Sequence, residues 1–269
     1  FEGFTSYYDD LLLRRAGLID HAAYLRLLAK TINQVLQTPG RHVQSVAQAS
    51  FDAWVKYYRQ DENTPNATVS YYTKGALVAL CLDLALRQHG RATLDGLMRA
   101  LWQTTGGGPM TEADVLAQLR ALTGRDWQPE IAQWVHGTQD LPLADLLAAH
   151  GVALQPEPAQ PAQRLGLRVT ENGGLHVKTV LRGGPAEAAG FMAGDEWLAL
   201  EAAGQAWRLR KLADLPLYAG AAPQVTAWVA RDARVLRLPL ALPPASATGD
   251  TVRLQVADAA LAQPWLGPI

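Results

Sequence analysis

Residues 71–88 decide the fold of the first half of the chain. They read Tyr-Tyr-Thr-Lys-Gly-Ala-Leu-Val-Ala-Leu-Cys-Leu-Asp-Leu-Ala-Leu-Arg-Gln. This run predicts a helix that is apolar nearly all round and that ends before Gly90. Such a helix is buried inside a bundle instead of lying half exposed on its surface. Its cysteine, Cys81, is therefore expected to be a small core side chain. Three tryptophans farther along the chain are also expected in the core: Trp102, Trp127 and Trp134.

Helical patterns flank this run on both sides, so residues 1–154 are predicted to form a helical bundle. A first helix is expected at residues 5–16, before Gly17, and a second from an N-cap at Asp20 to about residue 37. Ser45 is the expected cap of a third helix, and Thr111 with Asp114 resembles a capping box. Further helices are expected at about residues 45–55, 93–104, 112–122, 128–136 and 142–149.

The character of the sequence changes near residue 155. Residues 155–163 contain three prolines and no large apolar side chain, so a linker is predicted there. Residues 164–243 are predicted to form a β-rich domain, followed by a C-terminal tail at 244–269 with one more possible strand at 251–256. The expected strands of the β-rich domain are 165–169, 175–180, 197–200, 225–229 and 235–240, with a short helix at about 210–218.

The composition narrows the class of protein. Lys and Arg number 24 and Asp and Glu number 25, which gives a net charge of −1 without a basic stripe, so nucleic acid is not an expected partner. No apolar run is long enough to span a bilayer, so no membrane span is expected. One cysteine allows no internal disulfide, and the redox compartment is left open.

Four motifs, in order, resemble a known family. They are Glu-Gly-Phe-Thr-Ser-Tyr-Tyr at 2–8, Ala-Ser-Phe-Asp-Ala-Trp-Val-Lys-Tyr-Tyr-Arg at 49–59, Ser-Tyr-Tyr-Thr-Lys-Gly-Ala-Leu-Val-Ala-Leu at 70–80 and Gly-Thr-Gln-Asp-Leu-Pro-Leu at 137–143. Together they resemble the bacterial glycyl-aminopeptidase family of zinc metallopeptidases that carry a PDZ domain. The resemblance covers nearly the whole chain. It implies the C-terminal part of a gluzincin-type catalytic domain and a peptide or protein substrate cut near its N-terminus.

The resemblance assigns two site residues in the helical half. It implies that Glu2 is the third zinc ligand, beside two histidines of a His-Glu-x-x-His helix, and that the Tyr72 phenol stabilises the transition state. Taken alone, Glu2 is equally a charge at a helix start, and Tyr72 an aromatic packed under residues 60–67. Only one of Tyr71 and Tyr72 is expected to point into the site, because helix neighbours face about 100° apart. Lys74 is expected to be structural.

The chain departs from the family pattern because no two of its six histidines lie three or four residues apart. Two zinc ligands and the general base are therefore absent, and this chain alone is expected to bind no catalytic zinc and to be inactive. We expect zinc, activity and any export signal to belong to a longer parent that continues upstream of Phe1, in the bacterial cytoplasm or periplasm. Self-association through a surface left uncovered by the truncation is also expected.

The β-rich half resembles a PDZ domain. Residues 183–200 resemble the central segment of a PDZ domain, with a one-turn helix at 185–189 that ends at Gly190 in a positive-φ conformation. Leu165, Gly166 and Leu167 resemble the loop that binds a peptide C-terminus through backbone N–H groups, with the helix near 210–218 as the other wall of the groove. The alternative is a PDZ fold that only packs against the catalytic domain and binds no ligand.

Two other functions stay open at this point. One is a non-catalytic interaction protein whose PDZ-like module binds C-terminal tails, and the other is a degenerate enzyme whose parent has lost its zinc helix. The enzymatic interpretation requires Glu2 and Tyr72 to face one open cleft. An interaction protein has no reason to meet this requirement.

Overall fold

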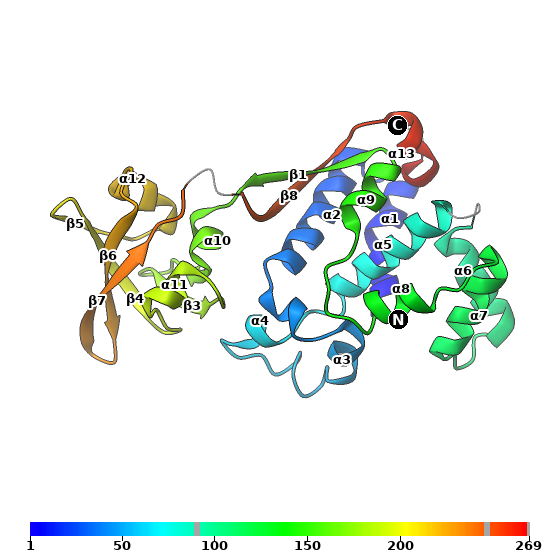
Figure 1. The fold of residues 1–269 in the computed structure, drawn as a ribbon, viewed down its shortest axis with the longest axis horizontal. Helices are drawn as coiled ribbons and strands as arrows, with labels where there is room; N and C mark the ends of the chain where they lie inside the picture. The colour runs from blue at the N-terminus through cyan, green and yellow to red at the C-terminus, as the bar shows by residue number, and fades with distance from the viewer. Residues whose placement is uncertain (89–91, 245–247, 268–269) are drawn as a thin grey trace.

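The structure, a computed structural model, describes residues 1–88, 92–244 and 248–267. Two lobes lie side by side: a helical lobe that holds both ends of the described chain and a β-rich lobe (Figure 1). A ladder of two strands, β1 and β8, runs between the lobes (Figure 1). The predicted fold class, a helical part followed by a β-rich part, is confirmed.

The helical lobe is built around α5, whose residues from Lys74 to Leu86 are all buried. The prediction of a helix buried on every face is therefore confirmed, and Cys81 is fully buried within it. No helix in the described part of the chain is long and apolar enough to cross a membrane. The helices of this lobe are α1 (Glu2–Arg15), α2 (His21–Leu36), η1 (Pro39–His42), α3 (Val46–Phe51), α4 (Thr64–Ala67), α5 (Thr73–Gln88), α6 (Leu94–Thr105), α7 (Glu112–Thr123), α8 (Gln128–Trp134), α9 (Leu143–Ala149) and α13 (Ala259–Leu266).

The helix starts follow from the capping residues that the sequence indicated. The Asp20 carboxylate accepts a hydrogen bond from the Ala23 amide at 2.7 Å and begins α2. Ser45 caps α3, and its partner in the capping box is Gln48. Thr111 and Asp114 form the expected capping box of α7.

The predicted linker at 155–163 is wrong. Strand β1 (Val152–Pro158) pairs antiparallel with β8 (Thr248–Val256), and the helix α10 (Pro161–Leu165) follows it. The two strands form a separate two-stranded sheet. The prolines are compatible with this sheet because both of its strands are edge strands, where a missing N–H donor costs little.

The C-terminal segment is not a tail. Strand β8 lies along α2, where the Asn33 side chain bonds the Val252 carbonyl at 2.9 Å and the Val252 amide at 2.8 Å. Helix α13 then inserts Trp265, 2% exposed, into the helical core. The Trp265 indole donates to the Tyr7 hydroxyl at 3.2 Å, which in turn donates to Asp83 of α5 at 2.8 Å. Residues 248–267 therefore complete the helical lobe.

The β-rich lobe contains a sheet with the strand order β2-β3-β4-β6-β7, and β5 pairs with β4. The expected one-turn helix is α11, and its exit residue Gly190 has φ +87°. Strand β5, which carries Trp207, was not predicted, because its four residues are all exposed and lack a buried face. The elements are β2 (Leu167–Thr170), β3 (His176–Val180), α11 (Pro185–Ala189), β4 (Glu196–Ala202), β5 (Gln205–Arg208), η2 (Leu212–Asp214), α12 (Leu215–Ala219), β6 (Gln224–Arg231) and β7 (Arg234–Ala241).

One buried asparagine joins the two lobes. The Asn66 side chain donates to the Val180 carbonyl at 2.8 Å and accepts from the Arg182 amide at 2.9 Å. Asn66 therefore satisfies a donor and an acceptor at the end of β3 in the way a neighbouring strand would. Because Asn66 is only 6% exposed, the sequon that it begins is not available as a glycosylation site.

Candidate functional site

Two glycines bring α1 and α5 into close contact at the N-terminal ends of both helices. A Cβ atom on Gly3 would stand 2.5 Å from the carbonyl carbon of Gly75, and a Cβ on Gly75 would stand 2.9 Å from the Gly3 Cα. Only glycine on both helices allows this approach. Glu2 precedes Gly3, and Tyr72 lies three residues before Gly75, so the glycine contact places both side chains at one end of the helix pair.

A cavity of about 530 Å³ opens at this end, and both Glu2 and Tyr72 line it. The Glu2 side chain is exposed in the first turn of α1, where a carboxylate is favoured by the helix dipole. Tyr72 is half-buried at the start of α5, where its carbonyl accepts the Ala76 amide at 2.8 Å. The expectation that these two residues face one cleft agrees with this geometry.

Tyr71 also lines the cavity, so the expectation that only one of the two neighbouring tyrosines faces it is wrong. The reason is that α5 begins at Thr73, so both tyrosines precede the regular helix and the 100° rule does not apply to them. Their ring centroids lie 4.6 Å apart with an interplanar angle of 33°. The two rings form one wall of the cavity together.

Tyr58 is a member of this wall that the sequence reasoning did not single out. Its hydroxyl lies 2.9 Å from the Tyr72 hydroxyl and 3.1 Å from the Tyr71 hydroxyl. Tyr57 and Trp54 pack on its ring at centroid distances of 5.3 and 5.1 Å. The signal was available, since Tyr58 belongs to the motif at residues 49–59. We call Trp54, Tyr57, Tyr58, Tyr71 and Tyr72 the aromatic cluster.

The three bonded phenols of the aromatic cluster differ in acidity. The hydroxyl–hydroxyl bonds to Tyr71 and Tyr72 lower the pKa of Tyr58 below its usual value. The same bonds to Tyr58 raise the pKa of both Tyr71 and Tyr72. The raised pKa keeps the Tyr72 phenol protonated at neutral pH, so Tyr72 retains a proton that it can donate.

The remaining walls of the cavity are mainly apolar. They come from Val46 and Val78, and from Ile131 and Val135 of the segment around α8. The second carboxylate of the lining belongs to Glu112, which is paired with His136 at 2.6 Å. The cavity can therefore accept an apolar group beside a carboxylate and a phenol.

Lys74 is structural, as expected. Its side chain is buried, and its ammonium donates to the Arg41 carbonyl at 3.2 Å and to the Gln139 carbonyl at 3.5 Å. Burial lowers the pKa of Lys74. Arg41 also pairs with Asp140 at 2.9 Å. The motifs at residues 70–80 and 137–143 are thus joined by Lys74, which fixes the start of α5.

Metal-binding side chains are sparse in the described residues. Among them, no three His, Cys, Asp or Glu side chains gather into a group that could hold a metal ion. Glu2 stands at the cavity as one carboxylate, and the Thr5 hydroxyl lies 3.4 Å from its Oε2 atom. The described residues therefore do not bring together the three protein ligands of a catalytic zinc site in this cavity.

The PDZ-like loop lies at the lobe junction, where Gly166 and Leu167 line a cleft with Leu36 and Gln37 of the helical lobe. Leu165 and Leu167 are buried in the core of the β-rich lobe, and Gly166 between them has φ +71°. The Gly166 amide donates to the Gln163 carbonyl at 3.1 Å as the cap of α10. One of the N–H groups expected to hold a peptide is therefore already bonded. The peptide-binding role of the loop stays a prediction.

Comparisons with known proteins agree with these motifs. The sequence profile of the M61 glycyl aminopeptidase family matches residues 1–78. The crystal structure of an aminopeptidase N family protein from Idiomarina loihiensis aligns with a TM-score of 0.87 and 32% identity, over 99% of this chain and 48% of that one. The chain therefore spans about half the length of this relative.

A photosystem II D1 C-terminal processing protease aligns with 21% identity and a TM-score of only 0.25, over 62% of this chain and 43% of that one. No curated protein matches the chain.

Proposed function

Because this chain belongs to the M61 glycyl aminopeptidase family, whose profile matches residues 1–78, we propose that it carries part of the catalytic site of a zinc-dependent aminopeptidase. One observation supports the proposal more than any other: Glu2 and Tyr72 line the same cavity. The glycine contact between Gly3 and Gly75 brings them there and joins two separate sequence motifs. A scaffold or adaptor has no need for that convergence.

In this proposal Glu2 is a zinc ligand, and the other ligands and the general base are not supplied by the described residues. A catalytic zinc takes three protein ligands and leaves one position open. When bound, the zinc ion acts as a Lewis acid that activates water and polarises the peptide carbonyl. Glu2 suits this role because its carboxylate is exposed at the cavity and has no cationic partner within the described residues.

Tyr72 is the proposed hydrogen-bond donor to the oxyanion that develops on the attacked carbonyl. A tyrosine phenol is protonated at neutral pH because its usual pKa is near 10, and the bond to Tyr58 raises the pKa of Tyr72 further. A donor already placed at the reacting carbonyl stabilises charge that forms only in the transition state. The Tyr58 hydroxyl lies 2.9 Å from the Tyr72 hydroxyl in the free protein. Because a phenol has a single O–H proton, Tyr72 turns this proton from the aromatic cluster to the oxyanion when the substrate reacts.

The proposed substrate is a peptide that enters with its N-terminal end. The apolar walls of Val46, Val78 and Ile131 suit a side chain or backbone segment of the substrate. A small N-terminal residue such as glycine is what the family name implies. We propose that the chain alone is inactive, because its described residues do not bring three zinc ligands together.

Intact mass of the native protein, with sequencing of any residues before Phe1, tests this proposal. A His-Glu-x-x-His segment upstream and about one zinc per chain are the expected result. A native protein without this segment and without zinc would refute the proposal.

The alternative function is that of a non-catalytic protein that binds C-terminal peptides through the PDZ-like lobe. It is favoured by one observation: β2 is an edge strand of its sheet, where a peptide strand could add. Peptide binding that perturbs the amides of β2, in a native protein without zinc, would select this alternative.

A further inference from the structure

A cleft of about 290 Å³ lies at the junction of the two lobes. Leu36, Gln37 and Pro39 of the helical lobe form one side. The other side is contributed by the β-rich lobe and includes three arginines: Arg164, Arg168 and Arg182. No Asp or Glu occurs among the described residues that line this cleft, so its walls carry positive charge only.

The three arginines keep guanidinium donors that have no partner among the described residues. The Arg182 guanidinium has no hydrogen-bond partner among the described residues, although its backbone amide bonds Asn66. Arg168 makes two long contacts, at 3.4 Å to the Gln37 carbonyl and 3.3 Å to the Thr38 hydroxyl. Arg164 donates to the Pro243 carbonyl at 3.1 Å, but its Nε atom is buried and unpaired.

Elsewhere in the structure, arginines close to acids form ion pairs. Arg231 pairs with the fully buried Asp195 at 2.7 Å, and Arg208 pairs with Glu196 at 2.9 Å. The acid closest in sequence to the cleft, Glu187, instead accepts the Gly183 amide at 2.6 Å. Positive charge therefore gathers in the cleft without the acids that balance it elsewhere in a chain of net charge −1.

Gly166 and Gly184 line the cleft and pack closely against each other's backbone. A Cβ on Gly166 would stand 3.1 Å from the Gly184 Cα, and a Cβ on Gly184 would stand 2.9 Å from the Leu165 carbonyl oxygen. The Asn66 bonds to Val180 and to the Arg182 amide fix the neighbouring segment. The backbone of Arg182 is therefore tied to the helical lobe through Asn66.

We propose that this cleft between the lobes binds an oxyanion, a carboxylate or phosphate group, through the guanidinium groups of Arg168 and Arg182 with support from Arg164. Guanidinium groups bind both anions with paired N–H donors, and such charge-assisted bonds are among the stronger ones in proteins. The site differs from the groove between β2 and α12, because its lining includes residues 181–185, after β3. The proposal is independent of the peptidase function.

Two sources of the oxyanion are distinguished by the probes. Isothermal titration calorimetry of the chain would use inorganic phosphate, the peptide acetyl-Gly-Ala-Leu with a free carboxylate, and the same peptide as its amide. Binding of the acid but not the amide identifies a peptide carboxylate as the ligand. Binding of phosphate alone identifies a free oxyanion. Either result supports the site if it depends on the cleft arginines.

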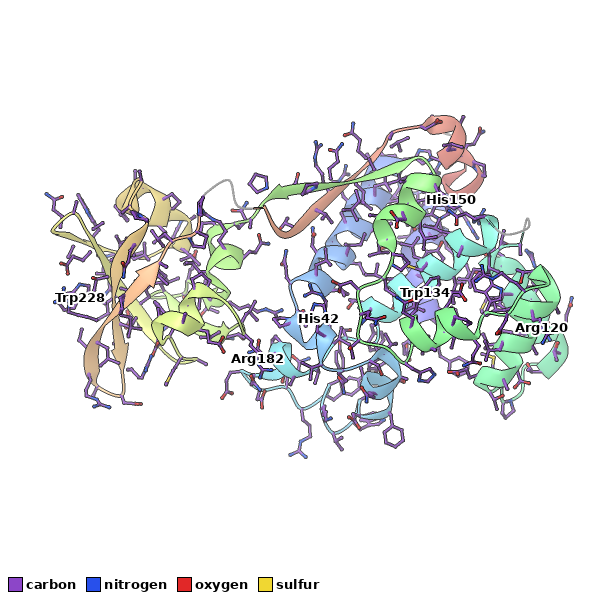
Figure 2. All side chains as sticks on the ribbon, in the orientation of Figure 1. His42, Arg120, Trp134, His150, Arg182 and Trp228 are labelled. Carbon is purple, nitrogen blue, oxygen red and sulfur yellow. The ribbon has the colours of Figure 1, made fainter. Side chains whose placement is uncertain are left out.

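The variants are Arg168→Gln and Arg182→Gln, with Arg120→Gln as the matched control. Arg182 lies at the lobe junction and Arg120 at the far end of the helical lobe (Figure 2). Neither guanidinium has a hydrogen-bond partner among the described residues, so both substitutions should leave the fold intact, as circular dichroism would check. We expect each cleft variant to weaken binding about tenfold or more and Arg120→Gln to leave it unchanged.

The side-chain NH2 signal of Asn66 provides a second readout by NMR, because this amide contacts the backbone on both sides of Leu181. The chemical shift of the Asn66 NH2 group should change on titration with a probe that binds and should stay constant with a probe that does not bind. The proposal is overturned if no probe binds at millimolar concentration, or if Arg168→Gln and Arg182→Gln bind as the wild-type chain does.

Discussion

Gly3 and Gly75 touch through their backbones, so that a Cβ atom on Gly3 would lie 2.5 Å from the carbonyl carbon of Gly75. This contact sets the distance between α1 and α5. The exposed Glu2 and the half-buried Tyr72 share a cavity as its consequence. The two glycines therefore explain why a glycine follows the acid in one motif and the lysine in the other.

Replacing either glycine should separate the two helices. Gly3→Ala and Gly75→Ala each place a methyl group against backbone, which cannot move aside as a side chain can. We expect each change to lower the free energy of unfolding by about 1–3 kcal/mol, measured by urea denaturation.

Gly96→Ala is the matched control, because Gly96 also lies in a helix but its Cβ would meet only the Thr93 hydroxyl at 3.6 Å. It should be neutral or slightly stabilising, since alanine favours helix over glycine. If Gly3→Ala and Gly96→Ala lowered the free energy of unfolding equally, the close contact between α1 and α5 would be contradicted.

The hydroxyl bonds of the aromatic cluster predict an order of titration. The bonds to Tyr71 and Tyr72 lower the pKa of Tyr58, so Tyr58 should lose its proton first as the pH rises toward the usual tyrosine value near 10. Tyr58→Phe should remove this earliest tyrosinate signal. The same change should lower the pKa of Tyr72, whose raised value comes first from its bond to Tyr58.

NMR of the chain with 13C-labelled tyrosine would follow each ring separately. Tyr57→Phe is the control, since Tyr57 packs on Tyr58 without a hydrogen bond to it. It removes one phenol from the protein but should leave the earliest titration in place. If Tyr58→Phe does not move the titration of Tyr72, the two hydroxyls are not bonded in solution.

Trp265 should be essential to the helical lobe although it lies close to the end of the chain. It is 2% exposed and bonds Tyr7, which itself bonds Asp83. We expect Trp265→Ala to lower the stability of the helical lobe by about 3–5 kcal/mol, measured by chemical denaturation.

Leu261→Ala, in the same helix, removes a side chain that is 51% exposed and should lower the stability of the helical lobe far less than Trp265→Ala does. A Trp265→Ala protein as stable as this control would mean that the C-terminal segment does not dock on the helical lobe.

Local sequence signals predicted the helical lobe because its elements have local causes. Asp20 and Ser45 cap their own helices, and the apolar run of α5 is visible without any knowledge of its neighbours. The linker prediction failed because β1 acquires its structure from β8, which comes far later in the chain. Trp102 was expected in the core but is 69% exposed, where its ring lies against Gly107.

The site could be predicted only in part for the same reason. Glu2 and Tyr72 were marked by their motifs, but the close approach of Gly3 and Gly75 depends on how α1 and α5 pack. Tyr58 reaches Tyr72 across a tertiary contact that no spacing in the sequence reveals.

The most direct test of the account is a comparison of zinc content and kcat for the native protein and its Glu2→Gln and Tyr72→Phe variants. Matched controls are Glu112→Gln and Tyr71→Phe, which alter other residues of the same cavity. The account predicts that Glu2→Gln loses zinc and that Tyr72→Phe keeps zinc but loses about 10²–10³ in kcat. Full activity with normal zinc content in both variants would contradict the assignment of this cavity as the active site.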